Sequence, residues 1–113
     1  MKKIEAIISP SKLEDVRESL LEMGIHGMTV TEVRDFGRQK AHTEVYRGTE
    51  YKVEYLIKVR VETVVPQHLA HKAISIMMNK GQTGKTGSDS ILVSNVNDVS
   101  QVYTEGSSDS SLL

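Results

Sequence analysis

Four segments of the chain are predicted to form β-strands, from an alternation of apolar and polar residues that is clearest in the third and from a high content of β-branched residues in the second. They span residues 2–9, 28–33, 53–65 and 91–96. In the first segment Ile4, Ala6 and Ile8 fall on one face of the predicted strand, whereas Ile7 falls on the other face among charged residues. Each of these strands is therefore expected to bury one face and to leave the other available for a different contact.

Two segments between the strands repeat apolar residues at helical spacing instead. The first stripe consists of Leu13, Val16, Leu20 and Met23. We expect Ser9 or Ser11 to cap this helix, Pro10 to lie in its first turn, and Gly24 to end it. A second helix is predicted from Pro66 to near Gly81. Its expected packing residues are Leu69, Ala73, Ile74, Ile76 and Met77.

The order of these elements is strand–helix–strand, a long connection, and strand–helix–strand again. Two such halves predict an α+β fold of the ferredoxin-like, split βαβ kind (βαββαβ) with a mainly antiparallel sheet. Both helices would cover one face of that sheet. We expect Ile7, Val61 and Val65 on the bare face, where packing between the sheets of several subunits would cover them.

The connection Asp35–Tyr51, DFGRQKAHTEVYRGTEY, is the most unusual segment of the chain. Connections longer than about 12–15 residues are uncommon in small domains and usually serve a function or are disordered. This one mixes Phe36, Tyr46 and Tyr51 with charged side chains, which argues against simple disorder. It therefore predicts an element that binds a partner or switches conformation.

Composition narrows the class of protein. The chain has 113 residues, a formal net charge of −1 and no cysteine. This length suits a single domain, here predicted over residues 1–103 with a flexible tail at 104–113. The balanced charge gives no reason to expect nucleic-acid binding. No run of apolar residues suggests a signal peptide or direct membrane insertion, so a cytoplasmic location is expected.

No residue pattern assembles a catalytic or metal site. The glycine-rich segment Gly81–Gly87, GQTGKTG, lacks the first glycine of a Walker A motif, because Asn79 stands there, and it follows a helix instead of preceding one. It can still place backbone N–H groups near phosphates. His68 and His71 have no nearby acidic partner to complete a metal site. We therefore predict that the protein is not an enzyme and holds no metal of its own.

The long connection carries a resemblance to a known family. GMTVTEVRDFGRQKAHTEVYRGTEY and QTGKTG resemble the PII signal-transduction proteins, and the similarity runs from the N-terminus to about Val96. The resemblance implies a homotrimer with an adenine nucleotide, ATP or ADP, between its subunits. It also implies that residues 37–55, the T-loop, control a partner transporter or metabolic enzyme in nitrogen and carbon metabolism.

The resemblance further implies roles for individual residues. The nucleotide would contact Ile7, Thr29, Gly37, Arg38, Gln39, Glu62, Val64, Thr83, Gly84, Gly87, Ser88, Asp89 and Ser90. Gln39 and Lys58 match positions that bind 2-oxoglutarate together with magnesium and ATP. Tyr51 matches a tyrosine that is modified by nucleotidylation in many members, and Thr49 stands where some members carry a phosphorylated serine.

Several positions depart from the family pattern. Ser90 replaces a lysine, and Gln101 and Tyr103 replace arginines, all three of which would hold phosphates. Hydrogen bonds to charged groups contribute roughly 1.5–3 kcal/mol each, so ADP or AMP is expected to rival ATP, with magnesium needed only if ATP binds. Asp35 and Ala41 replace glycines, where a larger side chain crowds an anion. Two alternatives stay open: an interaction protein that has lost ligand sensing, and a weak ATPase of the same fold.

Overall fold

The structure is a computed structural model of the chain. It describes residues 1–36, 42–46, 49–53, 55–81 and 90–100, and for 42–46 and 49–53 it describes the backbone alone.

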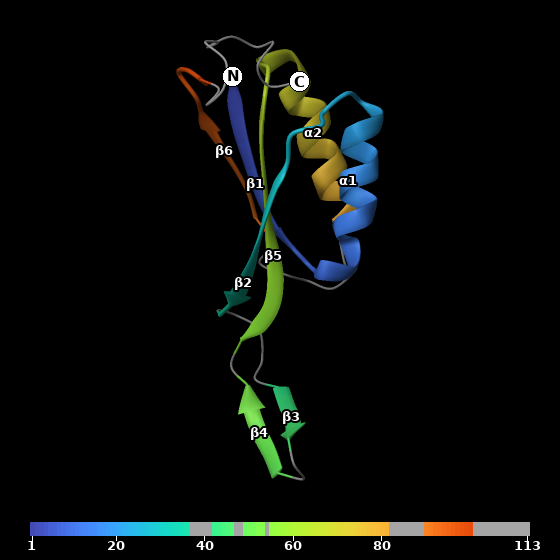
Figure 1. The fold of residues 1–113 in the computed structure, drawn as a ribbon, viewed down its shortest axis with the longest axis vertical. Helices are drawn as coiled ribbons and strands as arrows, with labels where there is room; N and C mark the ends of the chain where they lie inside the picture. Colours follow the sequence, from blue (N-terminus) through green and yellow to red (C-terminus); the bar gives the residue numbers. More distant parts are fainter. Residues whose placement is uncertain (37–41, 47–48, 54, 82–89, 101–113) are drawn as a thin grey trace.

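Four antiparallel strands form the main sheet, in the order β2-β5-β1-β6. They are β1 (Lys2–Ile8), β2 (Thr29–Asp35), β5 (Leu56–Val65) and β6 (Ile91–Asn95). The helices α1 (Leu13–Glu22) and α2 (Gln67–Lys80) lie together on one side of this sheet (Figure 1). This arrangement confirms the predicted βαββαβ, ferredoxin-like α+β fold.

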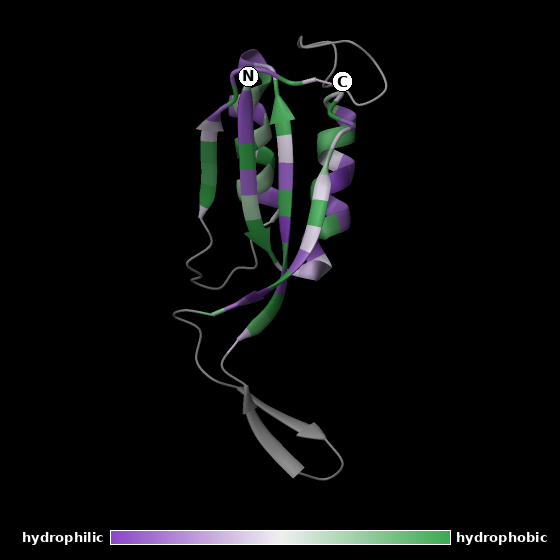
Figure 2. Cartoon of the chain, turned by 60° about the vertical axis from the view of Figure 1, so that its left-hand side comes forward, coloured by the Kyte–Doolittle hydropathy of each residue, from purple (hydrophilic) through white to green (hydrophobic). Residues whose placement is uncertain are grey.

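The core lies between the sheet and the helices because alternate strand residues point toward the helices. Figure 2 shows the resulting alternation of apolar and polar bands along β1 and its neighbours. The buried apolar residues are Ile4, Ala6, Ile8, Val16, Leu20, Ile25, Val59, Val61, Val65, Ala70, Ala73 and Met77. Thr63 is also buried there, and its hydroxyl donates a hydrogen bond of 2.6 Å to the carbonyl oxygen of Gly27. That hydrogen bond connects β5 to the residues that directly precede β2.

The start of α1 differs from the prediction. A short 3-10 helix, η1 (Pro10–Lys12), precedes α1, and the side chain of Ser9 makes no capping hydrogen bond. Neither serine caps α1 as expected, because Lys12 occupies its N-cap position, Ser9 precedes the 3-10 helix and Ser11 lies within it. Gly24 does follow the end of α1 and has φ of +91°, a conformation that favours glycine.

The expected bare-face positions of Val61 and Val65 are wrong. Both side chains are fully buried beneath the helices, at 0% exposure. Residues opposite one another on neighbouring strands share a face, and Val61 lies opposite Ala6 in the core-facing register. Ile7 pairs with Arg60 and does lie on the other face, as predicted.

A second, two-stranded sheet was not foreseen. β3 (His42–Tyr46) and β4 (Thr49–Val53) pair antiparallel within the predicted T-loop. The strand predicted over 53–65 is accordingly divided, since β4 ends at Val53 and β5 begins at Leu56. The hairpin lies beyond the ends of β2 and β5, far from both helices (Figure 1).

Candidate functional site

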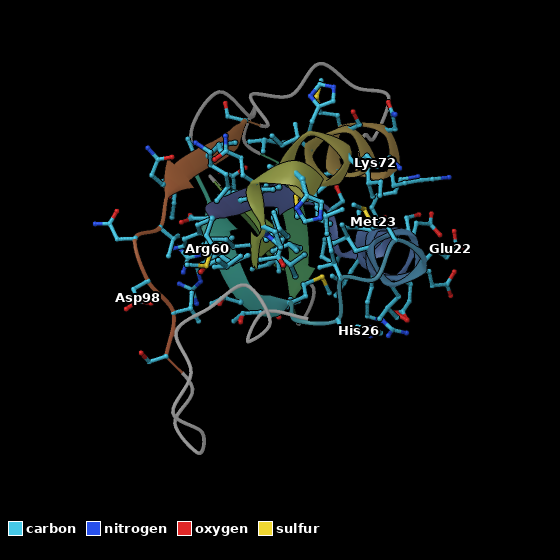
Figure 3. All side chains as sticks on the ribbon, turned by 90° about the horizontal axis from the view of Figure 1, so that it is seen from above. Glu22, Met23, His26, Arg60, Lys72 and Asp98 are labelled. Atoms are coloured by element: carbon cyan, nitrogen blue, oxygen red, sulfur yellow. The ribbon has the colours of Figure 1, made fainter. Side chains whose placement is uncertain are left out.

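The side of the main sheet that faces away from α1 and α2, here called the open face, carries several of the predicted ligand residues. Strand register places Thr29, Glu62 and Glu5 in one row across β2, β5 and β1. The next row consists of Thr31, Arg60 and Ile7. Viewed from above, Arg60 lies on the sheet side away from α1, whereas Glu22 projects outward from that helix (Figure 3).

Part of the nucleotide site implied by the resemblance is thus brought together. Ile7, Glu62 and Val64 are partly buried on the open face, and Thr29 is exposed at the start of β2. Ser90 is exposed and directly precedes Ile91, which pairs with Ala6 of β1. The other implied nucleotide contacts lie outside the described residues, namely Gly37, Arg38, Gln39, Thr83, Gly84, Gly87, Ser88 and Asp89.

A network of charged side chains occupies the middle of the open face. Lys3 Nζ lies 2.8 Å from Glu5 Oε1 and 3.6 Å from Glu62 Oε2. Arg60 Nε lies 2.9 Å from Glu62 Oε1, so Glu62 stands between two cations. The hydrogen bond from Lys3 lowers the pKa of the Glu5 carboxyl below its ordinary value. The same bond, together with the charges of Glu5 and Glu62, raises the pKa of Lys3.

Lys58 is the most buried charged residue among those that the structure describes. It lies on the open face opposite Val33, and only 9% of its side chain is exposed. Its ammonium Nζ lies 3.6 Å from Oδ2 of Asp35, at the last residue of β2. Removing a cation from water is costly unless an anion faces it, so the Asp35 carboxylate stabilises the buried lysine.

Aromatic contacts join the same two strand ends. The rings of Phe36 and Tyr55 lie 5.2 Å apart, tilted by 50°. The Arg34 guanidinium carbon lies 5.1 Å from the centre of the Tyr55 ring, within the range of a cation–π interaction. Together with the Asp35–Lys58 pair, these contacts connect the end of β2 to the start of β5, which is the base of the T-loop.

The hairpin β3–β4 places the proposed modification site on a strand. Tyr51 belongs to β4, and its Cα partner on β3 is Glu44. Thr49 lies opposite Tyr46 at the other end of the same pair of strands. The regular pairing gives this part of the T-loop a defined backbone register.

The remaining candidates from the sequence are the histidines of the second helix, which were considered as metal ligands. Within the described ranges, no group of three or more histidine or acidic side chains could hold a metal ion. His68 and His71 are both exposed on α2. No helix in the described part of the chain is both long enough and apolar enough to cross a membrane.

Arg34 and Tyr55 were missed by the sequence reasoning. Their only signal was position, since they flank the polar connection where the chain leaves one predicted strand and enters the next. Their contact depends on the antiparallel pairing of β2 with β5, in which Asp35 lies opposite Leu56.

Comparison with known proteins shows the family to which this chain belongs. Residues 1–106 match the family model "Nitrogen regulatory protein P-II". The chain is 51% identical over 112 residues to nitrogen regulatory protein P-II 1 of Escherichia coli (strain K12), covering 99% of this chain and 100% of that protein. It is 57% identical over 104 residues to nitrogen regulatory protein P-II of Pasteurella multocida, and 55% over 104 residues to that of Haemophilus influenzae, covering 92% of this chain and 93% of each relative.

Proposed function

Because the chain belongs to the nitrogen regulatory protein P-II family, we propose that it senses an adenine nucleotide between subunits of a homotrimer and reports through its T-loop. The protein is a nitrogen regulator and not an enzyme, as the residues themselves predicted. The proposal concerns the finer points: the trimer, the nucleotide and a partner that is a transporter or a metabolic enzyme.

The observation that carries this proposal is the position of the open face. Ile7, Thr29, Glu62 and Val64 come from three strands and share it, with Ser90 at the edge formed by β6. An apolar and charged sheet face left without helices in one subunit is a surface that another subunit can cover. A nucleotide held at such a boundary would bias the arrangement of the T-loop, whose base connects to β2 and β5.

The nucleotide preference follows from the phosphate-binding positions. A ligand with micromolar affinity has only about 8 kcal/mol of binding free energy. Positions 90, 101 and 103 are cationic in the family pattern but hold Ser90, Gln101 and Tyr103 here, and the loss of three charge-assisted bonds would weaken the binding of a triphosphate most. We therefore expect ADP or AMP to bind at least as tightly as ATP. Magnesium would matter only in the ATP complex.

Calorimetric titration with ATP, ADP and AMP, each with and without magnesium, tests the proposal. The expected result is binding of ADP or AMP with an affinity that equals or exceeds that of ATP. Tight, magnesium-dependent ATP binding that far exceeds ADP would contradict the preference. Absence of binding or thermal shift with every nucleotide would refute the sensor and favour the interaction protein that has lost ligand sensing.

A substitution makes the test specific to the site. Ser90→Lys adds the missing cation and is expected to tighten ATP about tenfold or more relative to AMP, since one charge-assisted bond contributes about 1.5–3 kcal/mol. His26→Lys is the matched control, because His26 is exposed beyond α1, at the opposite end of the sheet from Ser90. Equal ATP gains in both variants would indicate a general charge effect and not a site at Ser90.

A further inference from the structure

Arg60 lies in the middle of the open face, among residues that the resemblance assigns to the nucleotide, yet the resemblance gives it no role. Its Cα partner on β1 is Ile7, and its Cα partner on β2 is Thr31. Glu62, the next residue of β5 on the same face, follows after about 6.6 Å of strand rise. The side chain of Arg60 lies on the side of the sheet away from α1 (Figure 3). A ligand that contacts both Ile7 and Glu62 therefore passes beside Arg60.

The guanidinium of Arg60 has donor groups that the described chain does not use. Among the residues that the structure describes, its one ion-pair partner is Glu62, whose Oε1 lies 2.9 Å from Nε. That Nε is buried and donates no hydrogen bond within the described part of the chain. A guanidinium carries five N–H donors, and a buried donor without an acceptor is costly. Since 40% of the side chain is exposed, a ligand can reach the guanidinium at its terminal nitrogens.

Lys3, the neighbouring cation of the network, is more fully neutralised than Arg60. Its Nζ lies 2.8 Å from Glu5 Oε1 and 3.6 Å from Glu62 Oε2, so two carboxylates face it. The hydrogen bond from Lys3 is the main cause of the lowered pKa of Glu5, and the charge of Arg60 is the smallest cause. Arg60 therefore depends on Glu62, which it shares with Lys3. Of the two cations, Arg60 is the better placed to meet an incoming anion.

Phosphate is the anion that these groups suit best. The N–H fork of an arginine matches two oxygens of a phosphate, and such charge-assisted bonds are roughly twice as strong as bonds between neutral groups. Thr31, exposed on the adjacent strand opposite Arg60, adds a hydroxyl donor to the same row. The sequence meanwhile lacks the cations that the family pattern has at positions 90, 101 and 103. A phosphate at this site would therefore need a cation from elsewhere in the chain.

We propose that Arg60 binds a phosphate group of the nucleotide and replaces part of the charge lost at positions 90, 101 and 103. This inference rests on the proposed function and deepens it, since it adds a phosphate contact that the resemblance does not imply. The base would lie toward Val64 and Glu62, and the phosphates would extend along β5 past Arg60 toward the base of the T-loop. Glu62 would keep Lys3 as its counter-ion when Arg60 turns to the phosphate.

Calorimetric titration of the full chain with ADP tests the proposal. Adenosine, which has the same base and sugar but no phosphate, is measured by competition against ADP. Arg60→Gln and Arg60→Met both remove the charge, so that one serves if the other does not fold, and Arg60→Lys keeps the charge without the fork. Arg17→Gln is the matched control, because Arg17 is an exposed arginine of α1, on the other side of the sheet, and is paired with Glu14.

Both charge-removing variants are expected to bind ADP about tenfold more weakly than the wild type, since one charge-assisted hydrogen bond is lost. Their affinity for adenosine is expected to stay as in the wild type. The ADP affinity of Arg60→Lys should fall between these variants and the wild type, because an ammonium keeps the charge but not the planar fork. Arg17→Gln should bind both ligands as the wild type does.

Wild-type affinity for ADP in the charge-removing variants would overturn the proposal. An equal loss for adenosine would overturn it too, because Arg60 would then support the base or the fold and not the phosphate. A trimer that sedimentation shows to be lost in these variants but kept in Arg17→Gln would assign Arg60 to a carboxylate of a neighbouring subunit, against the proposal. If the wild type binds ADP and the Arg60 variants bind it equally well, this inference alone fails; if the wild type binds neither ligand, the proposed function fails with it.

Discussion

Gly81 ends α2 in a space that has no room for a side chain, and Gly81→Ala is expected to destabilise the protein. A β-carbon at this position would lie 2.6 Å from the carbonyl oxygen of Met77 and 2.9 Å from Cγ2 of Ile8. The Gly81 N–H also donates a 3.0 Å hydrogen bond to the Met77 carbonyl, so backbone movement away from the clash would lengthen that bond.

The size of the effect follows from two opposing terms. The φ of −85° suits alanine, and a compatible Gly→Ala change stabilises by about 0.4–1 kcal/mol through the unfolded chain. Overpacking a buried site costs about 1–3 kcal/mol. The clash with the Met77 carbonyl is harder to relieve than the clash with the Ile8 side chain, because it requires the backbone to move. We therefore expect net destabilisation of about 1–2 kcal/mol.

Urea denaturation at a single protein concentration measures this loss as a lower midpoint with an unchanged slope. Gly24→Ala is the comparison, because its β-carbon would meet nothing within 4 Å and its cost would come from φ of +91° alone. A double-mutant cycle with Ile8→Ala isolates the side-chain part of the clash. Wild-type stability of Gly81→Ala, or the absence of any coupling to Ile8→Ala, would refute the reasoning.

Three further outcomes are expected from the described contacts. Thr63→Val should lower the free energy of unfolding by about 1 kcal/mol, because the hydroxyl bond to the Gly27 carbonyl is lost; an unchanged urea midpoint would contradict this. The pKa of the Glu5 carboxyl, followed in an NMR pH series, should lie below its ordinary value because of the hydrogen bond from Lys3, and Lys3→Gln should abolish this difference. The contribution of Glu5 to stability is present above its unfolded pKa and should be lost as pH falls through the lowered folded pKa. Ile7→Glu should reduce the trimer population measured by sedimentation, since it places a charge on the open face; a trimer as stable as the wild type would count against that interface.

The alternation of residues along the chain was sufficient to predict the main architecture. Strand and helix periods identified the core residues Ile4, Ala6, Ile8, Val16 and Leu20, because burial of one face imposes a period of two on strands and about 3.6 on helices. The position of Gly24 was likewise readable, since few other residues accept positive φ. Periodicity did not say which face of β5 the helices cover, and the expected exposure of Val61 and Val65 was therefore wrong.

Local sequence also identified the T-loop and the resemblance that it carries, but not its internal pairing. The strands β3 and β4 arise from backbone pairing between His42–Tyr46 and Thr49–Val53, where apolar alternation is weak and charged residues are frequent. The register of such a hairpin depends on hydrogen bonds between strands, which no single strand displays in its composition.

In the candidate site, too, residue identities came from the sequence and contacts between residues came from the tertiary structure. The sequence by itself determined which residue types were present, including Asp35 and Ser90 at positions where the family pattern expects other residues. Only the tertiary structure decided that Asp35 faces Lys58, that Arg34 and Phe36 meet Tyr55, and that Glu62 stands between Lys3 and Arg60. Except for Arg60 and Glu62, which are neighbours on one face of β5, these contacts join residues at least 19 positions apart along the chain. Their electrostatic effect depends on distance and burial, which are set when the antiparallel strands align.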